Sequence, residues 1–276
     1  MKEVQEYLKS GKTLEDLTNE FGVKVYYHPT LPLVGMKYHQ LDSPKTHPVV
    51  RACRGTVLEK DTWEFVAVPF RRFFNLGEDL DNFKDFNWND FTCMEKVDGS
   101  IIIVYHYQGQ WHVNTSGSFG LLECEGSGKT WGELFWEASK IDVSKLDSEY
   151  TYVFEMWTPF NVVVRSYPES TAYLLSVFHV GTLNEVSVVE ADEFAKTIGV
   201  DRPEHHVFTS VDEILSYIKE KEQTDMTYEG FVIRDNKNQR YKIKSDTYRA
   251  LHRIRGESGN EYSPKNLVTL ILSGNS

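Results

Sequence analysis

Residues 95–99 read Glu-Lys-Val-Asp-Gly, and this stretch decides how the chain is interpreted. A lysine amine attacks phosphorus only after losing its proton, so its ordinary pKa of about 10.4 must be lowered by nearby cations or by burial. In an extended strand, Asp98 shares the face of Lys96, where its carboxylate can hold a metal ion or a water molecule. Gly99 permits a tight turn. Because so short a pattern recurs by chance, it is a weak signal when taken alone.

Three segments downstream strengthen this interpretation, because they supply complementary chemistry. They are Phe154-Glu155, Glu229-Gly230-Phe231-Val232 and Lys242-Ile243-Lys244. Lys242 and Lys244 are two residues apart in a predicted strand, so both ammonium groups face the same way and suit a triphosphate. If they lie near Lys96, they also favour its neutral form. We expect Glu229 to hold a metal ion or its water, and Glu155 to accept a ribose hydroxyl.

In this order the four segments resemble motifs I, III, IV and V of the covalent nucleotidyltransferases, which include polynucleotide ligases and capping enzymes. The chain is more closely similar to the phage-type ATP-dependent RNA ligases, the first of the two ligase types of T-even phages. Three further stretches carry that resemblance: Ala52-Cys53-Arg54-Gly55, Arg72-Phe73-Phe74-Asn75-Leu76, and Ser245-Asp246 with Tyr248 and Leu251-His252. The resemblance runs from about Arg51 to beyond His252, which is most of the chain.

The resemblance implies an α+β chain with the nucleotidyltransferase (ATP-grasp-like ligase) fold, in which two mainly antiparallel sheets are flanked by helices. It implies that Lys96 is the nucleophile that takes AMP from ATP, with Mg²⁺ or alternatively Mn²⁺ as the metal. The expected ATP-binding residues are Arg54, Arg72, Glu95, Lys96, Glu155, Val232, Lys242 and Lys244, and the expected metal residues are Asp98 and Glu229. The implied partner is RNA, either a single strand or a broken tRNA loop, and we expect a monomer.

Two positions depart from the family pattern. Arg72 stands where relatives carry lysine, which keeps the charge but changes its geometry. Ser116, in Asn114-Thr115-Ser116-Gly117-Ser118, stands where a basic residue is expected. The resemblance therefore leaves one phosphate contact without a cation.

The number of residues after the last motif separates the members of the superfamily. DNA ligases and capping enzymes carry an OB-fold there, and 32 residues after Lys244 are too few for one. We therefore expect a nucleotidyltransferase domain over residues 1–245, followed over residues 246–276 by a short helical segment or truncated specificity module that includes 267–271. The alternatives are another covalent nucleotidyltransferase, of the DNA ligase or capping type, and a non-catalytic RNA-binding relative.

The charge distribution is compatible with an RNA partner. The chain has a formal net charge of −11, but residues 234–255 contain eight Lys or Arg and two Asp. A local basic face on an acidic body can meet a phosphate backbone, although a solvated surface is the ordinary alternative. The amino terminus lacks the apolar core of a signal peptide and no apolar run reaches the length of a spanning helix. We expect a soluble protein of the cytoplasm, or of the cytoplasm of a phage-infected host.

Some patterns compete with this interpretation. Gly126-Ser127-Gly128-Lys129-Thr130 resembles the end of a P-loop, but Glu123 occupies the place of its first glycine and would repel phosphate. We therefore expect a turn before a helix over 130–139. Hydrophobic periodicity also predicts helices over the first twenty residues, 191–198 and 211–221, and a strand over 185–189. Hairpins are expected for 93–96 with 101–107, for 101–107 with 111–115, and for 231–234 with 240–243.

Overall fold

The computed structural model describes residues 1–78 and 84–255, and the chain divides into two compact units. Unit 1 comprises residues 1–73, 100–156 and 171–202, and unit 2 comprises residues 74–99, 157–170 and the chain from 203 onward. The chain therefore passes from one unit to the other several times. None of the described helices has both the length and the apolar character that crossing a membrane requires.

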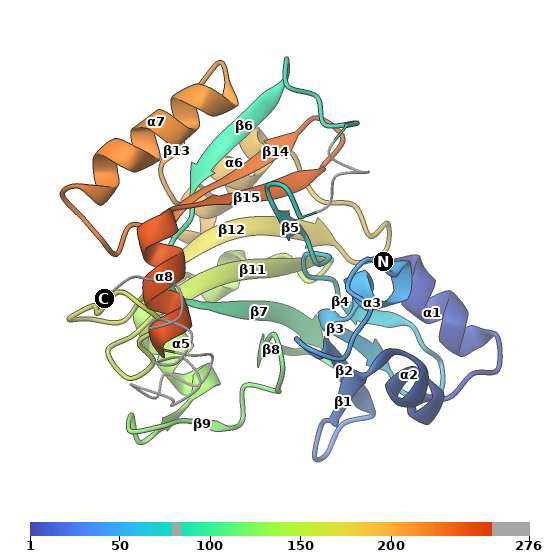
Figure 1. The fold of residues 1–276 in the computed structure, drawn as a ribbon. Helices are drawn as coiled ribbons and strands as arrows, with labels where there is room; N and C mark the ends of the chain where they lie inside the picture. The colour runs from blue at the N-terminus through green and yellow to red at the C-terminus, as the bar shows by residue number, and fades with distance from the viewer. Residues whose placement is uncertain (79–83, 256–276) are drawn as a thin grey trace. The chain divides into compact units, whose positions relative to one another are not determined.

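The first sheet of unit 1 has the strand order β1-β2-β3-β4 and is antiparallel (Figure 1). Its strands are β1 (Val23–Tyr27), β2 (Leu33–Tyr38), β3 (Arg54–Glu59) and β4 (Phe65–Ala67), and helices α1 (Lys2–Lys9), α2 (Leu14–Phe21) and α3 (Pro48–Ala52) pack with it. Thr13 and Asp16 form a capping box that begins α2, and Gly22 ends it with φ at +63°. This confirms the predicted helical start of the chain.

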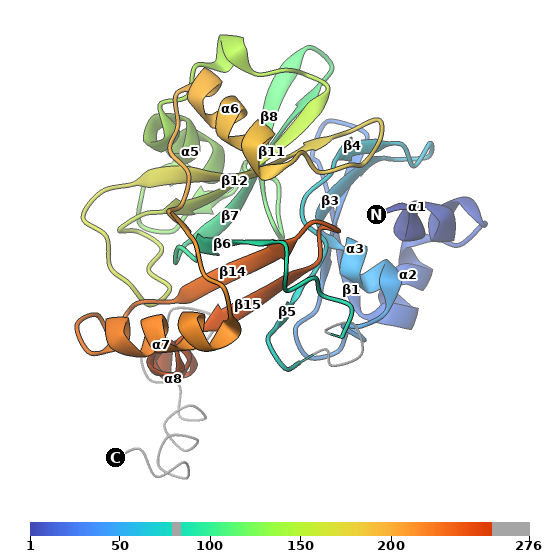
Figure 2. The same cartoon turned by 90° about the horizontal axis from the view of Figure 1, so that it is seen from above.

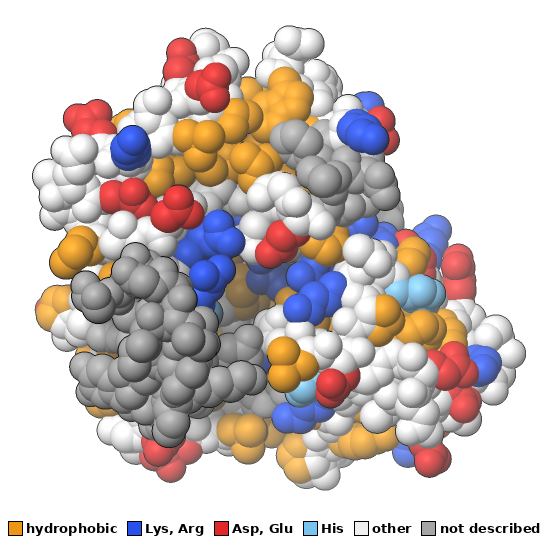
Figure 3. Space-filling view, in the orientation of Figure 1, with side chains coloured by type: hydrophobic (Ala, Val, Ile, Leu, Met, Phe, Trp, Pro, Cys, Tyr) orange, Lys and Arg blue, Asp and Glu red, His pale blue; other side chains and the backbone are white. Residues whose placement is uncertain are grey.

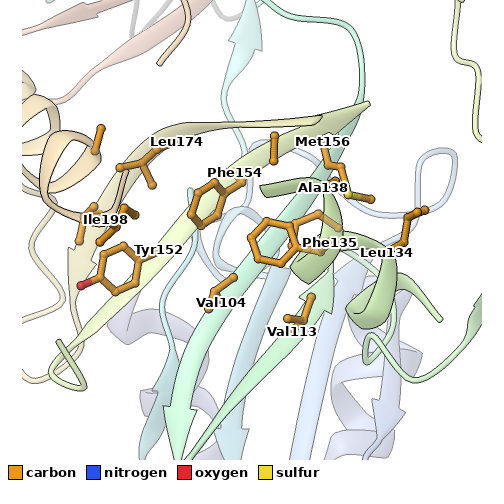
Figure 4. Close-up of a cluster of buried hydrophobic side chains, with 14 of the residues drawn as sticks. Val104, Val113, Leu134, Phe135, Ala138, Tyr152, Phe154, Met156, Leu174 and Ile198 are labelled. Carbon is orange, nitrogen blue, oxygen red and sulfur yellow. The ribbon is translucent and has the colours of Figure 1, made fainter. Parts of the chain in front are cut away.

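The second sheet of unit 1 has the order β12-β11-β7-β8, and helices α5 and α6 lie near it (Figure 2). Its strands are β7 (Ser100–Tyr107), β8 (Gln110–Thr115), β11 (Tyr150–Trp157) and β12 (Thr171–His179). The helices of this part are α5 (Trp131–Ser139), the 3-10 helix η1 (Val143–Lys145) and α6 (Val188–Ile198). It also contains two short strands, β9 (Glu123–Cys124) and β10 (Lys129–Thr130). Figure 4 shows Phe135 of α5, Phe154 of β11 and Ile198 of α6 within one buried cluster. Burial of such large apolar groups stabilises this half of the unit.

Unit 2 contains a five-stranded sheet in the order β13-β6-β14-β15-β5. Its strands are β5 (Phe74–Asn75), β6 (Phe91–Glu95), β13 (His205–His206), β14 (Gly230–Asp235) and β15 (Arg240–Lys244), and its helices are α7 (Val211–Glu222) and α8 (Asp246–Arg255). Ile214 and Ile218 of α7 join Phe231 and Ile233 of β14 in the buried core. The alternation along β14 and β15 therefore buries one face of the sheet and leaves Lys242 and Lys244 on the other.

The structure confirms most of the predicted elements. The hairpins β7–β8 and β14–β15 form as expected, and so do the helices α5, α6 and α7. The P-loop-like segment is a turn between β9 and β10, and Thr130 caps α5 through a capping box with Glu133. The stretch 267–271 lies outside the described residues.

Two predicted elements are wrong. Residues 93–96 and 101–107 do not pair with each other, because β6 pairs with β13 and β14 whereas β7 pairs with β8 and β11. Residues 185–189 do not form a strand: Glu185 makes one isolated bridge to Phe178, and α6 already begins at Val188 because Ser187 and Glu190 form a capping box. Pairing with distant strands decided the first case. The capping box at the start of α6 decided the second.

Candidate active site

Three strands of unit 2 bring the predicted nucleophile to its partners. Lys96 directly follows β6, and its backbone N–H donates to the carbonyl oxygen of Gly230 at 2.8 Å. Gly230 opens β14 and is the register partner of Lys244 at the end of β15. The pairing of β6 with β14 and of β14 with β15 therefore places Lys96, Glu229 and Lys244 side by side, although they are far apart in the sequence.

These three side chains form a compact ion cluster. Lys96 Nζ lies 2.9 Å from Glu229 Oε2, and Lys244 Nζ lies 2.7 Å from Glu229 Oε1. The Glu229 side chain is only 3% exposed, whereas those of Lys96 and Lys244 are about one-fifth exposed. Burial acts to raise the pKa of Glu229, but the two ammonium groups outweigh it and keep this pKa below its ordinary value. Glu229 is therefore a buried carboxylate that holds two cations.

Lys244 is also perturbed by its surroundings. Burial, followed by the positive charge of Lys96, lowers the pKa of Lys244, and the attraction of Glu229 offsets only part of this effect. Two ammonium groups share one carboxylate, so the cluster has an excess of positive charge. Such an excess attracts phosphate.

Gly230 explains why glycine follows the glutamate of this cluster. Its φ is +122°, and a Cβ at this position would lie 2.1 Å from the carbonyl oxygen of Ile243. A side chain would therefore separate β14 from β15 at the point where Lys96 is anchored. In this pair of residues, Glu229 supplies the buried charge, and Gly230 allows β14 and β15 to approach each other closely.

Asp98 is held by three hydrogen bonds within unit 2. Its Oδ2 accepts the backbone N–H groups of Val164 at 2.9 Å and Arg165 at 2.7 Å, and its Oδ1 accepts the hydroxyl of Tyr248 at 2.7 Å. Both Asp98 and Tyr248 are buried. The carboxylate therefore ties the segment after Lys96 to residues 157–170 and to α8.

The beginning of α8 is fixed from several sides. The carboxylate of Glu222 accepts the hydroxyl of Ser245 and the N–H of Thr247, and Lys244 Nζ lies 5.2 Å from the centre of the Tyr248 ring. Lys and Arg side chains gather where β15 runs into α8 (Figure 3). This junction therefore carries both positive charge and the hydroxyl that reaches Asp98.

Two other predicted residues of unit 2 lie on opposite faces of its sheet. Val232 is the register partner of Lys242 and alternates with the core residues Phe231 and Ile233, so it lies on the face of the lysines. Glu95 is the register partner of Phe231 on the core side. After the larger effect of burial, the charge of Glu95 helps to raise the pKa of Tyr228. The Glu95 side chain therefore lies on the core side of the sheet, near Phe231 and Tyr228.

The remaining predicted residues belong to unit 1. Arg54 begins β3 and places its guanidinium 5.3 Å from the centre of the Phe73 ring, while that of Arg72 lies 5.5 Å from the Tyr38 ring. Glu155 is buried in β11 as the register partner of Ile101. Stacking holds the two arginines in place, and the β-ladder holds Glu155.

Two carboxylates of unit 2, Glu229 of the ion cluster and the separately held Asp98, are the candidates for holding a divalent metal. Among residues 1–78 and 84–255 there is no group of three or more His, Cys, Asp or Glu side chains at metal-binding distance. One or two protein carboxylates suffice for a divalent metal that takes its remaining ligands from phosphate oxygens and water. Glu229 and Asp98 are the carboxylates that the sequence nominates for this role.

Sequence reasoning missed part of this arrangement. It named Tyr248 only as part of a matching stretch, and it did not foresee that the hydroxyl would reach Asp98. It gave no role to Val164 and Arg165, whose backbone N–H groups hold Asp98. Every residue except proline carries such a group, so no residue pattern reveals it.

Comparison with known proteins finds relatives along most of the chain. A family model described as RNA ligase matches residues 52–248. A protein of Autographa californica nuclear polyhedrosis virus, described as a bifunctional polynucleotide kinase/RNA ligase, is 29% identical over 280 residues, which cover 95% of this chain and 39% of that protein. An RNA ligase of Rhodothermus phage RM378 is 27% identical, with coverage of 80% of this chain and 63% of the relative. The chain thus spans less than two-thirds of the length of these relatives.

A solved structure shares the fold. It is described as an ATP-dependent DNA ligase from Aquifex aeolicus, and it aligns with a TM-score of 0.62 over 97% of this chain and 70% of its own, at 16% identity. This likeness confirms the nucleotidyltransferase fold that the order of the motifs predicted.

Proposed function

The chain belongs to the RNA ligase family, and on that basis we propose that it is an ATP-dependent ligase that joins RNA ends through a lysyl-AMP intermediate. The observation that carries the proposal is the buried cluster of Lys96, Glu229 and Lys244. It joins the family's nucleophile motif to its glutamate and lysine motifs. A protein that only bound RNA would not need all three groups.

The proposed reaction has three steps. Lys96 Nζ, after losing a proton, attacks the α-phosphorus of ATP; an N–P bond forms and pyrophosphate leaves with the electron pair of the broken P–O bond. AMP then passes to the 5′-phosphate of an RNA strand and releases Lys96. A 3′-hydroxyl attacks the activated 5′-phosphate, AMP leaves, and a phosphodiester bond remains.

The other residues receive roles in binding. We assign ATP phosphates to Arg54, Arg72, Lys242 and Lys244, the ribose to Glu155, and the adenine to Val232 and the backbone of Glu95. A divalent metal, Mg²⁺ or Mn²⁺, would offset the charge of the triphosphate and orient the pyrophosphate as it leaves. Glu229 and Asp98 are the carboxylates proposed to hold it, directly or through water.

The substrate, the cellular role and the location of the protein are also part of the proposal. We propose single-stranded RNA or a broken tRNA loop as the substrate, repair as the purpose, and a monomer in the cytoplasm of a cell or of a phage-infected host as the working form. Residues 1–245 would perform the adenylylation, with Tyr248 holding Asp98 in place, and residues 246–276 would otherwise contribute to the choice of RNA.

The experiment that tests the proposal is the detection of the covalent intermediate. Wild-type protein incubated with α-labelled ATP and Mg²⁺ should retain label on a denaturing gel, and mass spectrometry should find AMP on Lys96. Lys96→Ala should abolish the label, whereas Lys237→Ala, which removes an exposed lysine from the β14–β15 turn, should not. AMP on a different lysine, or a wild-type protein that never acquires label, would refute the proposal.

The choice of polynucleotide is tested separately. Strands of RNA and of DNA with matched sequences and 5′-phosphates should be compared for sealing, with GTP replacing ATP in a parallel reaction. Sealing of RNA with ATP supports the proposal. Preferential sealing of DNA would favour a DNA ligase, and label from GTP alone would favour a capping-type enzyme.

A further inference from the structure

The first sheet of unit 1 aligns three cations across adjacent strands. In the β1–β2 ladder Lys24 is the register partner of Lys37, and in the β2–β3 ladder Lys37 is the register partner of Arg54. Like charges directly opposite each other in a sheet destabilise it. A row of this kind gathers positive charge on one face of the sheet, and such a face attracts anions.

A local irregularity brings the middle cation to a turn of the neighbouring sheet. The β2–β3 register shifts between Met36 and Lys37, and Gly55 has a φ of +90°. A Cβ at Gly55 would lie 3.1 Å from the Cα of Ser116. A Cβ at Gly117 would lie 2.7 Å from Lys37 Cδ and 3.2 Å from Lys37 Nζ. The Lys37 side chain thus lies directly against Gly117, and Gly55 lies directly against Ser116.

This turn is rich in hydroxyl and N–H groups. Thr115 Oγ1 accepts the backbone N–H groups of Gly117 at 3.2 Å and Ser118 at 3.1 Å, and it lies 2.9 Å from Ser118 Oγ. The turn therefore holds its shape through its own side chains. The Lys37 ammonium group lies beside Gly117 of this turn, and Ser116 lies next to the strand that begins with Arg54.

Cations and hydroxyl groups gathered from several segments form an environment that suits phosphate. We propose that Lys37 is a phosphate-binding residue of this protein, which acts with Arg54 on a phosphate group of the nucleotide or of the RNA 5′ end. The proposal rests on the proposed ligase function. Lys37 brings a positive charge to the turn where Ser116 replaces an expected basic residue, but it does so from a different strand.

The first test removes the charge and keeps the bulk of the side chain. Lys37→Met is compared with Lys24→Met, which removes the neighbouring, exposed cation of the same row. Loss of one hydrogen bond to a charged group corresponds to about a tenfold to hundredfold loss in rate or affinity. We expect a loss of this size for Lys37→Met and less than a threefold change for Lys24→Met.

Separate measurements identify which phosphate is bound. If Lys37 contacts ATP, Lys37→Met slows the formation of lysyl-AMP. If it contacts the RNA end, lysyl-AMP forms normally, but its AMP passes slowly to 5′-phosphorylated RNA, and binding no longer distinguishes a 5′-phosphate from a 5′-hydroxyl. Unchanged rates and unchanged binding in all of these measurements would overturn the proposal.

The second test moves the cation to the other side of the same space. Lys37→Ala removes the atoms that a side chain at Gly117 would strike, and Gly117 lacks the positive φ that disfavours L-residues. The double variant Lys37→Ala/Gly117→Lys should therefore recover at least a third of the rate that Lys37→Ala loses, whereas Gly117→Lys alone should be impaired by the collision.

The outcomes separate this inference from the proposed function. A wild-type protein without lysyl-AMP refutes the ligase function, whatever Lys37 does. An active wild type with an equally active Lys37→Met refutes only the phosphate site. A loss in both Lys37→Met and Lys37→Ala that Gly117→Lys does not restore, in double-variant protein with the wild-type melting temperature, would assign Lys37 to packing and overturn the proposal.

Discussion

Glu229 is the residue on which the ion cluster depends, because both of its oxygen atoms hold a lysine. Glu229→Gln would leave two partly buried ammonium groups without their counter-charge, and removing one partner of a buried ion pair typically costs about 3–5 kcal/mol. We expect a lower melting temperature and a severe loss of lysyl-AMP. Glu204→Gln, at a side chain that is 71% exposed, is the control and should change neither.

The lowered pKa of Glu229 also leads to a prediction of how the stability of the protein depends on pH. The pKa of Glu229 is lowered in the folded protein, so its contribution to stability is complete above its ordinary pKa and is lost as the pH falls through the folded value. The stability difference between wild type and Glu229→Gln should therefore narrow in acid. Chemical denaturation at a series of pH values measures it. A difference that stays constant from neutral pH down to pH 3 would show that the charge of Glu229 is not the stabilising feature.

Tyr248 allows the two possible roles of Asp98 to be separated. Tyr248→Phe deletes only the hydroxyl that donates to Asp98 at 2.7 Å, so we expect slower lysyl-AMP formation with an unchanged requirement for Mg²⁺. Asp98→Asn should raise the Mg²⁺ concentration needed for half-maximal rate if Asp98 also holds the metal. Magnesium titrations of both variants decide this, with the exposed Tyr27→Phe as control. A raised Mg²⁺ requirement in Tyr248→Phe would contradict a purely positioning role for the hydroxyl.

For single residues, the sequence predicted which charged side chains come together better than it predicted which other residues contact them. Lys96, Glu229 and Lys244 were predicted as one group because their charges suit a triphosphate and its metal and because they follow the family order, and the structure brings the three side chains together. Lys37 and the contact between Tyr248 and Asp98 were not, since they depend on a register shift in one case and on a distant helix in the other. Neither leaves a periodic pattern in the sequence.

Among the elements, α8 carries both Tyr248, which contacts Asp98, and the arginines for which we expect a contact with RNA. Arg249 and Arg253 of this helix are exposed, and Arg249 lies 3.6 Å from Asp246. Each phosphate contact to a single strand contributes a salt slope of about −0.7. Arg249→Ala/Arg253→Ala should therefore flatten the salt dependence of RNA binding by up to about 1.4 while lysyl-AMP still forms. RNA binding is measured at several salt concentrations, with Lys196→Ala/Lys219→Ala, at two exposed lysines outside residues 234–255, as the matched control.

A salt slope that remains unchanged in the double arginine variant would contradict this prediction. It would assign the arginines to solvated ion pairs, which contribute little when exposed. The basic residues Arg51, Arg71 and Arg72 of unit 1 would then be the next candidates for the RNA contact.

Elements were predictable where local signals settle them. The capping boxes at Thr13 and Thr130 begin α2 and α5 within stretches predicted as helical, and two hairpins follow from turns between neighbouring strands. The capping box at Ser187 was missed, so α6 begins earlier than predicted. The pairing of β6 was not predictable, because its partners β13 and β14 come from far downstream. Proximity in sequence favoured a hairpin across Asp98-Gly99, whereas the actual hydrogen-bond partners arrive much later in the chain.

For the whole molecule, the boundary between the catalytic part and the carboxyl-terminal part can be tested by shortening the chain. A chain that ends after Arg255 keeps Tyr248 and its bond to Asp98, so we expect it to form lysyl-AMP at a rate close to that of the full chain. A chain that ends after Ser245 loses that bond and should form much less lysyl-AMP. Circular dichroism checks that both fold. Equal rates in the two shortened chains would place the catalytic boundary at residue 245.

The strand order of unit 2 has a consequence for synthesis of the protein. When β6 leaves the ribosome, neither of the strands that flank it has been made, since β13 begins at residue 205 and β14 at residue 230. At about 5–20 residues per second, the ribosome needs about 7 to 27 s after β6 to synthesise the chain as far as β14. During that time both of its edges can pair with another nascent chain. Until β14 emerges, β6 is therefore a point at which two nascent chains of this protein can pair wrongly with each other.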